Sequence, residues 1–90
     1  MYEDKEYLDI VGQRIKAQRL KLNISQQELA EFCGKNVRTI SLLENGKGTH
    51  LLTLIRILRK LDLDLGLLEL IPEVKSNPFD KKTTSRERAS

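Results

Sequence analysis

The segment from residue 24 to residue 46 constrains the fold of this chain most, because it carries the start and stop signals of two short helices in close succession. Ser25 is suited to cap the first helix, since its hydroxyl accepts a hydrogen bond from a free backbone N–H of the first turn. Glu28, three residues later, completes the pattern of a capping box. Gly34 stands where a helix ends in a left-handed residue, and Asn36 is a second N-cap candidate. The sequence therefore predicts two helices joined by a tight turn.

The apolar residues of this segment recur at helical spacing. Leu29, Phe32 and Cys33 share one face of the first helix at positions i, i+3 and i+4. Ile40 and Leu43 point to one side of the second helix. We expect the core of the domain to include Leu29, Cys33, Ile40 and Leu43.

Two longer helices flank this pair. The first is predicted from about residue 7 to residue 21, and its apolar stripe consists of Leu8, Val11, Ile15 and Leu22. The second is predicted from about residue 50 to residue 61, with Thr49 or His50 as its cap. Its expected buried stripe consists of Leu51, Leu54, Ile55 and Leu58.

The leucine-rich segment 61–71 admits two interpretations. A helix that Asp64 opens and that ends before Pro72 fits the spacing of Leu63, Leu67, Leu70 and Ile71. Residues 63–67 also alternate between apolar and small or polar residues as a strand does. The alternation breaks at residues 67 and 68, which favours the helix.

Charge and composition narrow the classes of function. Residues 10–61 hold ten Lys or Arg against three acidic residues, whereas residues 1–9 and 62–74 are net acidic. Such a concentration of positive charge favours a polyanionic partner. One Cys and one His provide neither a disulfide framework nor a metal site. No apolar run approaches the roughly 20 residues that span a membrane. The sequence also shows no phosphate-binding glycine loop, catalytic triad or carboxylate dyad. We therefore expect a cytoplasmic protein that is not an enzyme and has no cofactor, no metal and no membrane partner.

Residues 10–61 resemble the Cro/CI/XRE-type DNA-binding domains of phage repressors and bacterial regulators, and the resemblance extends more weakly to residue 71. The matching residues are Arg19, Gln26, Glu28-Leu29-Ala30, Gly34, Thr39-Ile40-Ser41 and Glu44-Asn45-Gly46-Lys47. The resemblance implies an all-α fold, a compact four- to five-helix lambda-repressor-like domain over residues 7–71 with a helix-turn-helix at its centre. Residues 72–90, poor in apolar residues, are expected to form a flexible, disordered basic tail.

The resemblance also implies which residues contact DNA. Gln26 would grip a phosphate at the start of its helix. Val37, Arg38 and Leu42 would face the base edges, with the two apolar residues exposed to solvent in the free protein, unless Leu42 packs under the following helix. Arg38 is the only strong base-reading donor among them. The full expected set is Gln26, Gln27, Lys35, Asn36, Val37, Arg38, Ser41, Leu42, Asn45 and Lys47.

Two further expectations follow from the resemblance. Arg19 and Glu44 resemble an internal ion pair that ties the first predicted helix to the third. The function implied is a dimeric repressor that binds double-stranded DNA at a palindromic operator. An alternative is an antitoxin of a HipBA-like system, which would bind a HipA-type kinase toxin and repress its own operon. HipB-type proteins have an intersubunit strand where ordinary members have a fifth helix, so segment 61–71 bears on this choice.

Overall fold

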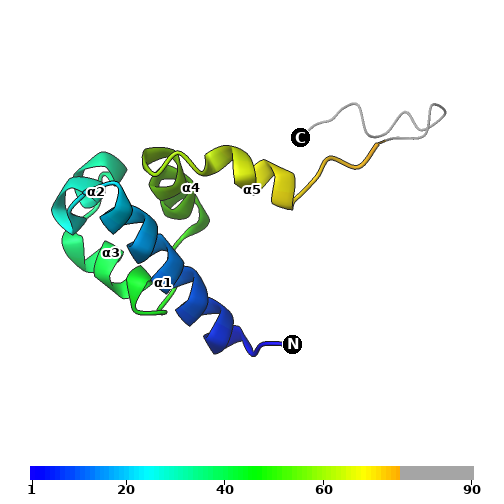
Figure 1. Ribbon diagram of the computed structural model, residues 1–90, viewed down its shortest axis with the longest axis horizontal. Helices are drawn as coiled ribbons and strands as arrows, with labels where there is room; N and C mark the ends of the chain where they lie inside the picture. The colour runs from blue at the N-terminus through cyan, green and yellow to red at the C-terminus, as the bar shows by residue number, and fades with distance from the viewer. Residues whose placement is uncertain (76–90) are drawn as a thin grey trace.

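The computed structural model describes residues 1–75, where the chain forms five helices and no strand. The helices are α1 (Asp4–Lys21), α2 (Gln26–Cys33), α3 (Val37–Glu44), α4 (Leu51–Lys60) and α5 (Asp64–Leu70). α3 packs against both α1 and α2, and α4 packs against α2, whereas α5 contacts only α4 and leads away from the other helices (Figure 1). The predicted all-α fold is confirmed. Most of the predicted disordered tail, residues 76–90, lies outside the described residues.

The hydrophobic core forms where α2, α3 and α4 meet. Leu29, Ile40 and Ile57 contribute one fully buried side chain from each of these helices. Ile15 of α1 and Leu61 at the end of α4 close the cluster. Each such side chain stabilises the fold by about 1.5–3 kcal/mol through removal of apolar surface from water. The core residues predicted from the sequence are confirmed as buried: Leu29, Cys33, Ile40 and Leu43.

The first helix differs from its prediction in where it begins. α1 starts at Asp4 rather than near residue 7, because Glu3 and Glu6 form a capping box that satisfies free backbone N–H groups of the first turn. The backbone N–H of Glu3 donates to Oε1 of Glu6 at 2.8 Å. The acidic side chains of this turn also complement the positive end of the helix dipole.

The apolar stripe predicted for α1 is wrong except at Ile15. Leu8, Val11 and Leu22 are exposed. The face that α1 buries carries Gly12 and Arg19 beside Ile15. Periodicity of apolar residues misplaces this face because two of its three buried positions are a glycine and a charged residue.

The buried face of α4 also differs from the predicted apolar stripe. The buried side chains of α4 are Thr53 and Ile57, while Leu51 is 66 % exposed. The other predicted members, Leu54, Ile55 and Leu58, are half-buried. His50 occupies the N-cap position, but its side chain makes no capping hydrogen bond.

Phe32, which the sequence places on one apolar face of α2 with Leu29 and Cys33, is 46 % exposed. Its ring lies beneath the Lys60 ammonium group, 5.3 Å from the centroid, which is the arrangement of a cation–π contact. The buried residues of α2 are Leu29, Ala30 and Cys33, so the face toward the core is turned toward Ala30 and away from Phe32.

Residues 64–70 of segment 61–71 form a helix, so the alternative strand is wrong for this chain. Asp62 adopts a left-handed conformation with φ of 62°, which ends α4. The backbone N–H of Leu63 donates to the carbonyl oxygen of Leu58 at 2.7 Å. No neighbouring strand exists within residues 1–75 to pair with this segment, whereas a helix satisfies its backbone groups internally.

Gly12 lies where α1 approaches the C-terminal end of α3 most closely. A Cβ added at Gly12 would overlap the carbonyl oxygen of Leu43 and lie 2.8 Å from that of Glu44. Both obstacles are backbone atoms, which cannot turn aside as a flexible side chain does. The contact between α1 and α3 therefore depends on the absence of a side chain at this position.

We predict that Gly12→Ala lowers the free energy of unfolding by about 1–3 kcal/mol, because overpacking outweighs the gain in helix propensity. Gly66→Ala is the matched control, since Gly66 also lies within a helix but has open space around its Cβ position. It should leave stability unchanged or raise it by up to about 1 kcal/mol. Urea denaturation followed by circular dichroism measures both. Equal stabilisation by the two substitutions would contradict the close approach.

Candidate nucleic-acid interface

The turn between α2 and α3 is fixed by backbone geometry and two side-chain caps. Gly34 adopts the predicted left-handed conformation, with φ of 68°. The backbone N–H of Lys35 donates to the carbonyl oxygen of Ala30 at 2.9 Å, which closes the end of α2. Oδ1 of Asn36 then accepts from the backbone N–H of Thr39 at 3.0 Å and starts α3. The two helices are therefore held in one relative orientation by a three-residue connection.

Of the two hydrogen bonds predicted to cap α2, one is confirmed. Oγ of Ser25 accepts from the backbone N–H of Glu28 at 3.0 Å. The backbone N–H of Ser25 does not donate in return to the Glu28 carboxylate, so the predicted capping box is not formed. One free donor of the first turn is thus satisfied by a side chain at the start of the helix-turn-helix.

α3 has one face in the core and one face toward solvent. Ile40, Leu43 and Glu44 are buried. On the opposite side Arg38 is exposed, and its guanidinium makes no hydrogen bond or ion pair within residues 1–75. Leu42 is half-buried at the edge of this outward face. A free guanidinium on a helix that is anchored from behind suits contact with another molecule.

Val37 was expected to face solvent, and this expectation is wrong. Its side chain is half-buried and packs against the core cluster. Val37 opens α3 immediately after the turn, where the helix still lies against the body of the domain. The solvent-facing side of α3 therefore does not include Val37, contrary to the prediction from the sequence.

The remaining polar residues of the expected set lie on both sides of α3. Nδ2 of Asn45 donates to the carbonyl oxygen of Ser41 at 2.9 Å, so the Asn45 side chain lies back along α3. The backbone N–H of Lys47 donates to the carbonyl oxygen of Leu42 at 2.9 Å, and the Lys47 side chain is exposed. Lys35 is exposed in the preceding turn. Nε2 of Gln27 donates to Oε2 of Glu31 at 3.0 Å on the exposed side of α2.

Behind this surface lies a buried ion pair. Nε of Arg19 donates to Oε2 of Glu44 at 2.7 Å, and Nη2 of Arg19 donates to Oε1 of Glu44 at 3.2 Å. The two side chains are 7 % and 2 % exposed. The predicted ion pair is therefore present, and it is a bidentate pair of the kind that arginine forms best.

Gln26 joins this pair. Its Nε2 donates to Oε1 of Glu44 at 3.0 Å. The remaining guanidinium nitrogen of Arg19, Nη1, donates to the carbonyl oxygen of Ile24 at 2.8 Å in the turn before α2. Residues from α1, α2 and α3 thus converge on one carboxylate. Sequence reasoning placed Gln26 at a phosphate and did not identify this contact.

The side chains of the described residues are not arranged for metal binding or for thiol chemistry. No group of His, Cys, Asp and Glu in residues 1–75 is arranged to hold a metal ion. Burial raises the pKa of the Cys33 thiol, which keeps it protonated and unreactive.

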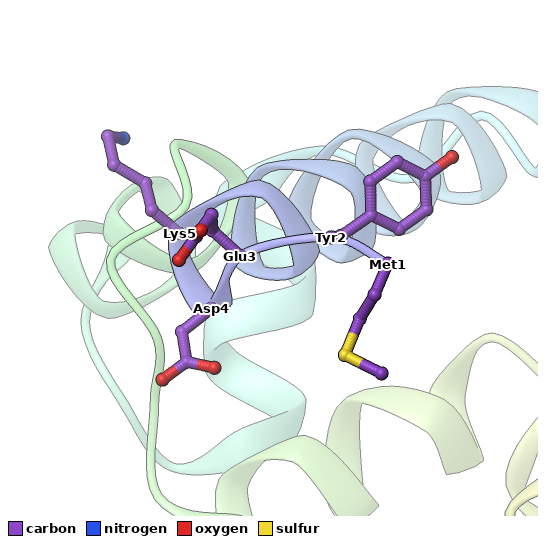
Figure 2. A pocket seen from close by; sticks show the side chains of 5 residues that line it. All are labelled: Met1, Tyr2, Glu3, Asp4 and Lys5. Atoms are coloured by element: carbon purple, nitrogen blue, oxygen red, sulfur yellow. The ribbon is translucent and has the colours of Figure 1, made fainter.

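Figure 2 shows a hollow at the start of the chain, lined by five consecutive residues whose side chains diverge. No helix among the described residues is long and apolar enough to cross a membrane.

The leucines of segment 61–71 border a groove that was not predicted from the sequence. α5 does not contact α1, and the space between them is an apolar groove of about 400 Å³. Arg14 and Gln18 of α1 are the polar residues of its lining. The apolar lining comes from α1, α4 and α5 and consists of Val11, Ile15, Leu54, Leu58, Leu63, Leu67 and Leu70.

The comparison with known protein families agrees with this architecture. A helix-turn-helix family model matches residues 15–68, from the middle of α1 into α5. No curated protein matches the chain significantly. The matched region contains the capped pair of helices, the left-handed Gly34 between them and the ion pair behind them. The chain belongs to the helix-turn-helix family of Cro/CI/XRE type, whose members bind DNA.

Proposed function

We propose that this DNA-binding transcription regulator is a repressor that acts as a dimer on a palindromic operator. The observation that carries the proposal is the free, exposed guanidinium of Arg38 on the outward face of a helix that is anchored by its other face. The major groove of B-DNA admits an α-helix, and base edges there present a unique pattern of donors and acceptors. α3 is the helix suited to enter it.

The residues around Arg38 support this orientation. Leu42, at the edge of the same face, offers an apolar contact to a thymine methyl group. Lys35 before α3 and Lys47 after it would neutralise phosphates on either side of the groove, and Gln26 would hydrogen-bond another. The remaining polar members of the proposed DNA-binding set, which flank these positions, are Gln27, Asn36, Ser41 and Asn45.

We predict that Arg38 reads a guanine by a bidentate contact to O6 and N7. Arg38→Ala should then lose about 1–3 kcal/mol of discrimination at one base pair per half-site. The measurement starts with selection of duplexes from a random-sequence library by the native protein. Affinities for the selected duplex and its single-base variants are then compared at fixed salt.

Arg59→Ala is the matched control, because it removes the same charge from an exposed position at the end of α4. It should preserve the base preference. If Arg38→Ala weakens binding to all duplexes by the same factor, Arg38 is a phosphate contact instead.

The apolar surface of α5 supports dimerisation. Leu63, Leu67 and Leu70 line the groove, while Leu65 and Leu68 are 71 % and 67 % exposed. A helix that is apolar on several sides is normally buried against another element. A second copy of the chain would supply that element, and a two-fold dimer would place two α3 helices on half-sites about 10–10.5 bp apart.

Charge is also consistent with self-association. Arg14 lies in the lining of the groove and makes no ion pair within residues 1–75. α5 carries two acidic residues, Asp64 and Glu69, and these also have no ion-pair partner in the described part of the chain. One chain thus provides both a groove with a basic residue and an apolar helix with acidic ones. This complementarity favours a second copy as the occupant.

We predict that Leu67→Asp and Leu70→Asp each shift the protein to a monomer, because a carboxylate would be buried in an apolar interface. Monomers should bind the selected duplex weakly at physiological salt, since two half-sites no longer act together. Sedimentation velocity measures the oligomeric state. Leu20→Asp, at an exposed leucine of α1 outside the groove lining, is the control and should remain dimeric. An unchanged dimer in both α5 variants would exclude α5 from the interface.

The antitoxin alternative rests on the same exposed apolar surface. A HipA-type kinase toxin would then cover α5, and DNA binding would repress the shared operon. The helical form of segment 64–70 favours the ordinary repressor, because the resemblance to HipB-type proteins implied a strand there. Purification of the protein from its native host distinguishes the two: co-purification of a kinase in stoichiometric amount supports the antitoxin, and co-purification of DNA alone supports the repressor.

A further inference from the structure

We propose that Glu44 is a positioning residue for DNA binding, because its buried carboxylate holds the side-chain amide of Gln26 in the orientation that meets a DNA phosphate. The inference rests on the proposed contact between Gln26 and DNA. It assigns to the ion pair of Arg19 and Glu44 a role in affinity as well as in stability.

The geometry is that of one carboxylate shared by two donors. Oε1 of Glu44 accepts from Nε2 of Gln26 at 3.0 Å and from Nη2 of Arg19 at 3.2 Å. The Glu44 side chain is 2 % exposed, so water does not replace either donor. A carboxylate only accepts hydrogen bonds, which fixes the amide nitrogen of Gln26 rather than its oxygen toward Glu44.

The amide nitrogen of Gln26 carries two N–H groups, and Glu44 uses one. The other has no acceptor within residues 1–75, and Gln26 lies at the first residue of α2, where anions are favoured by free backbone N–H groups. Glu44 therefore orders the Gln26 side chain before DNA binds, which lowers the entropy cost of its contact with a phosphate.

The test is a double-mutant cycle in DNA affinity, with the selected duplex as the probe. Gln26→Ala is measured in the native protein and in the variant Arg19→Met/Glu44→Leu, because replacement of a buried ion pair by apolar residues of similar size often preserves stability. We expect Gln26→Ala to weaken binding about tenfold in the native protein, the loss of one hydrogen bond to a charged group. In the apolar background the loss should fall below about twofold.

Gln13→Ala, at an exposed glutamine of α1, is the matched control and should bind as tightly as the native protein. An equal loss from Gln26→Ala in both backgrounds would overturn the proposal, as would no loss in the native protein. Failure of the native protein to select any duplex would instead overturn the proposed function itself.

A second measurement on the native protein keeps the proposal testable if the apolar variant does not fold. The two side-chain amide protons of Gln26 are observed by NMR before and after addition of the duplex. We expect two distinct protons in the free protein, one of which shifts on binding while the one bonded to Glu44 stays in place. If neither proton responds to DNA, Gln26 only ties α2 to α3 and the proposal is wrong.

Discussion

The carboxylate of Glu44 is the point at which α1, α2 and α3 are tied together. It lies at the end of α3, accepts two hydrogen bonds from Arg19 of α1 and one from Gln26 of α2, and is almost fully buried. Removal of one partner from a buried ion pair costs about 3–5 kcal/mol, because the other charge remains buried without compensation. That is a large share of the roughly 5–15 kcal/mol by which a small domain is stable. The orientation of α3 therefore depends on a polar contact as much as on the apolar core.

Gly12 allows the close approach of α1 to α3 that the ion pair between Arg19 and Glu44 requires. The end of α3 that holds Glu44 is also the end whose carbonyl oxygens approach Gly12 of α1. A bulkier residue there would push the two helices apart and stretch the hydrogen bonds between Arg19 and Glu44. The buried face of α1 thus combines a glycine, an isoleucine and an arginine, each with a separate role.

How far the sequence predicted this molecule depends on whether a feature is local. Ser25, Gly34 and Asn36 set the ends of α2 and α3 through contacts within a few residues, and the structure has those ends as predicted. The buried faces of α1 and α4 were misplaced because Gly12, Arg19 and Thr53 are buried there, and a search for apolar periodicity does not count a glycine, an arginine or a threonine. The bond from Gln26 to Glu44 joins residues 18 apart in the chain, so no local signal could indicate it.

The groove beside α5 was missed for a related reason. Apolar periodicity indicates that Leu54, Leu58 and Leu67 tend toward burial. It does not indicate whether the element that covers them belongs to the same chain or to another molecule. In this chain they face a space that α1 and α5 leave open. The groove is lined by residues of α1, α4 and α5 and by none of α3, so the proposed dimerisation and the proposed base reading would use different parts of the domain.

A residue-resolved NMR titration with the selected duplex tests the central claim most directly, which is that α3 and the residues flanking it meet DNA while being anchored from behind. The account predicts that the largest backbone amide shifts fall at the start of α2, along α3 and in the loop through Lys47. The first turns of α1 should be unaffected. Shifts confined to α4 and α5, with α3 unchanged, would contradict it.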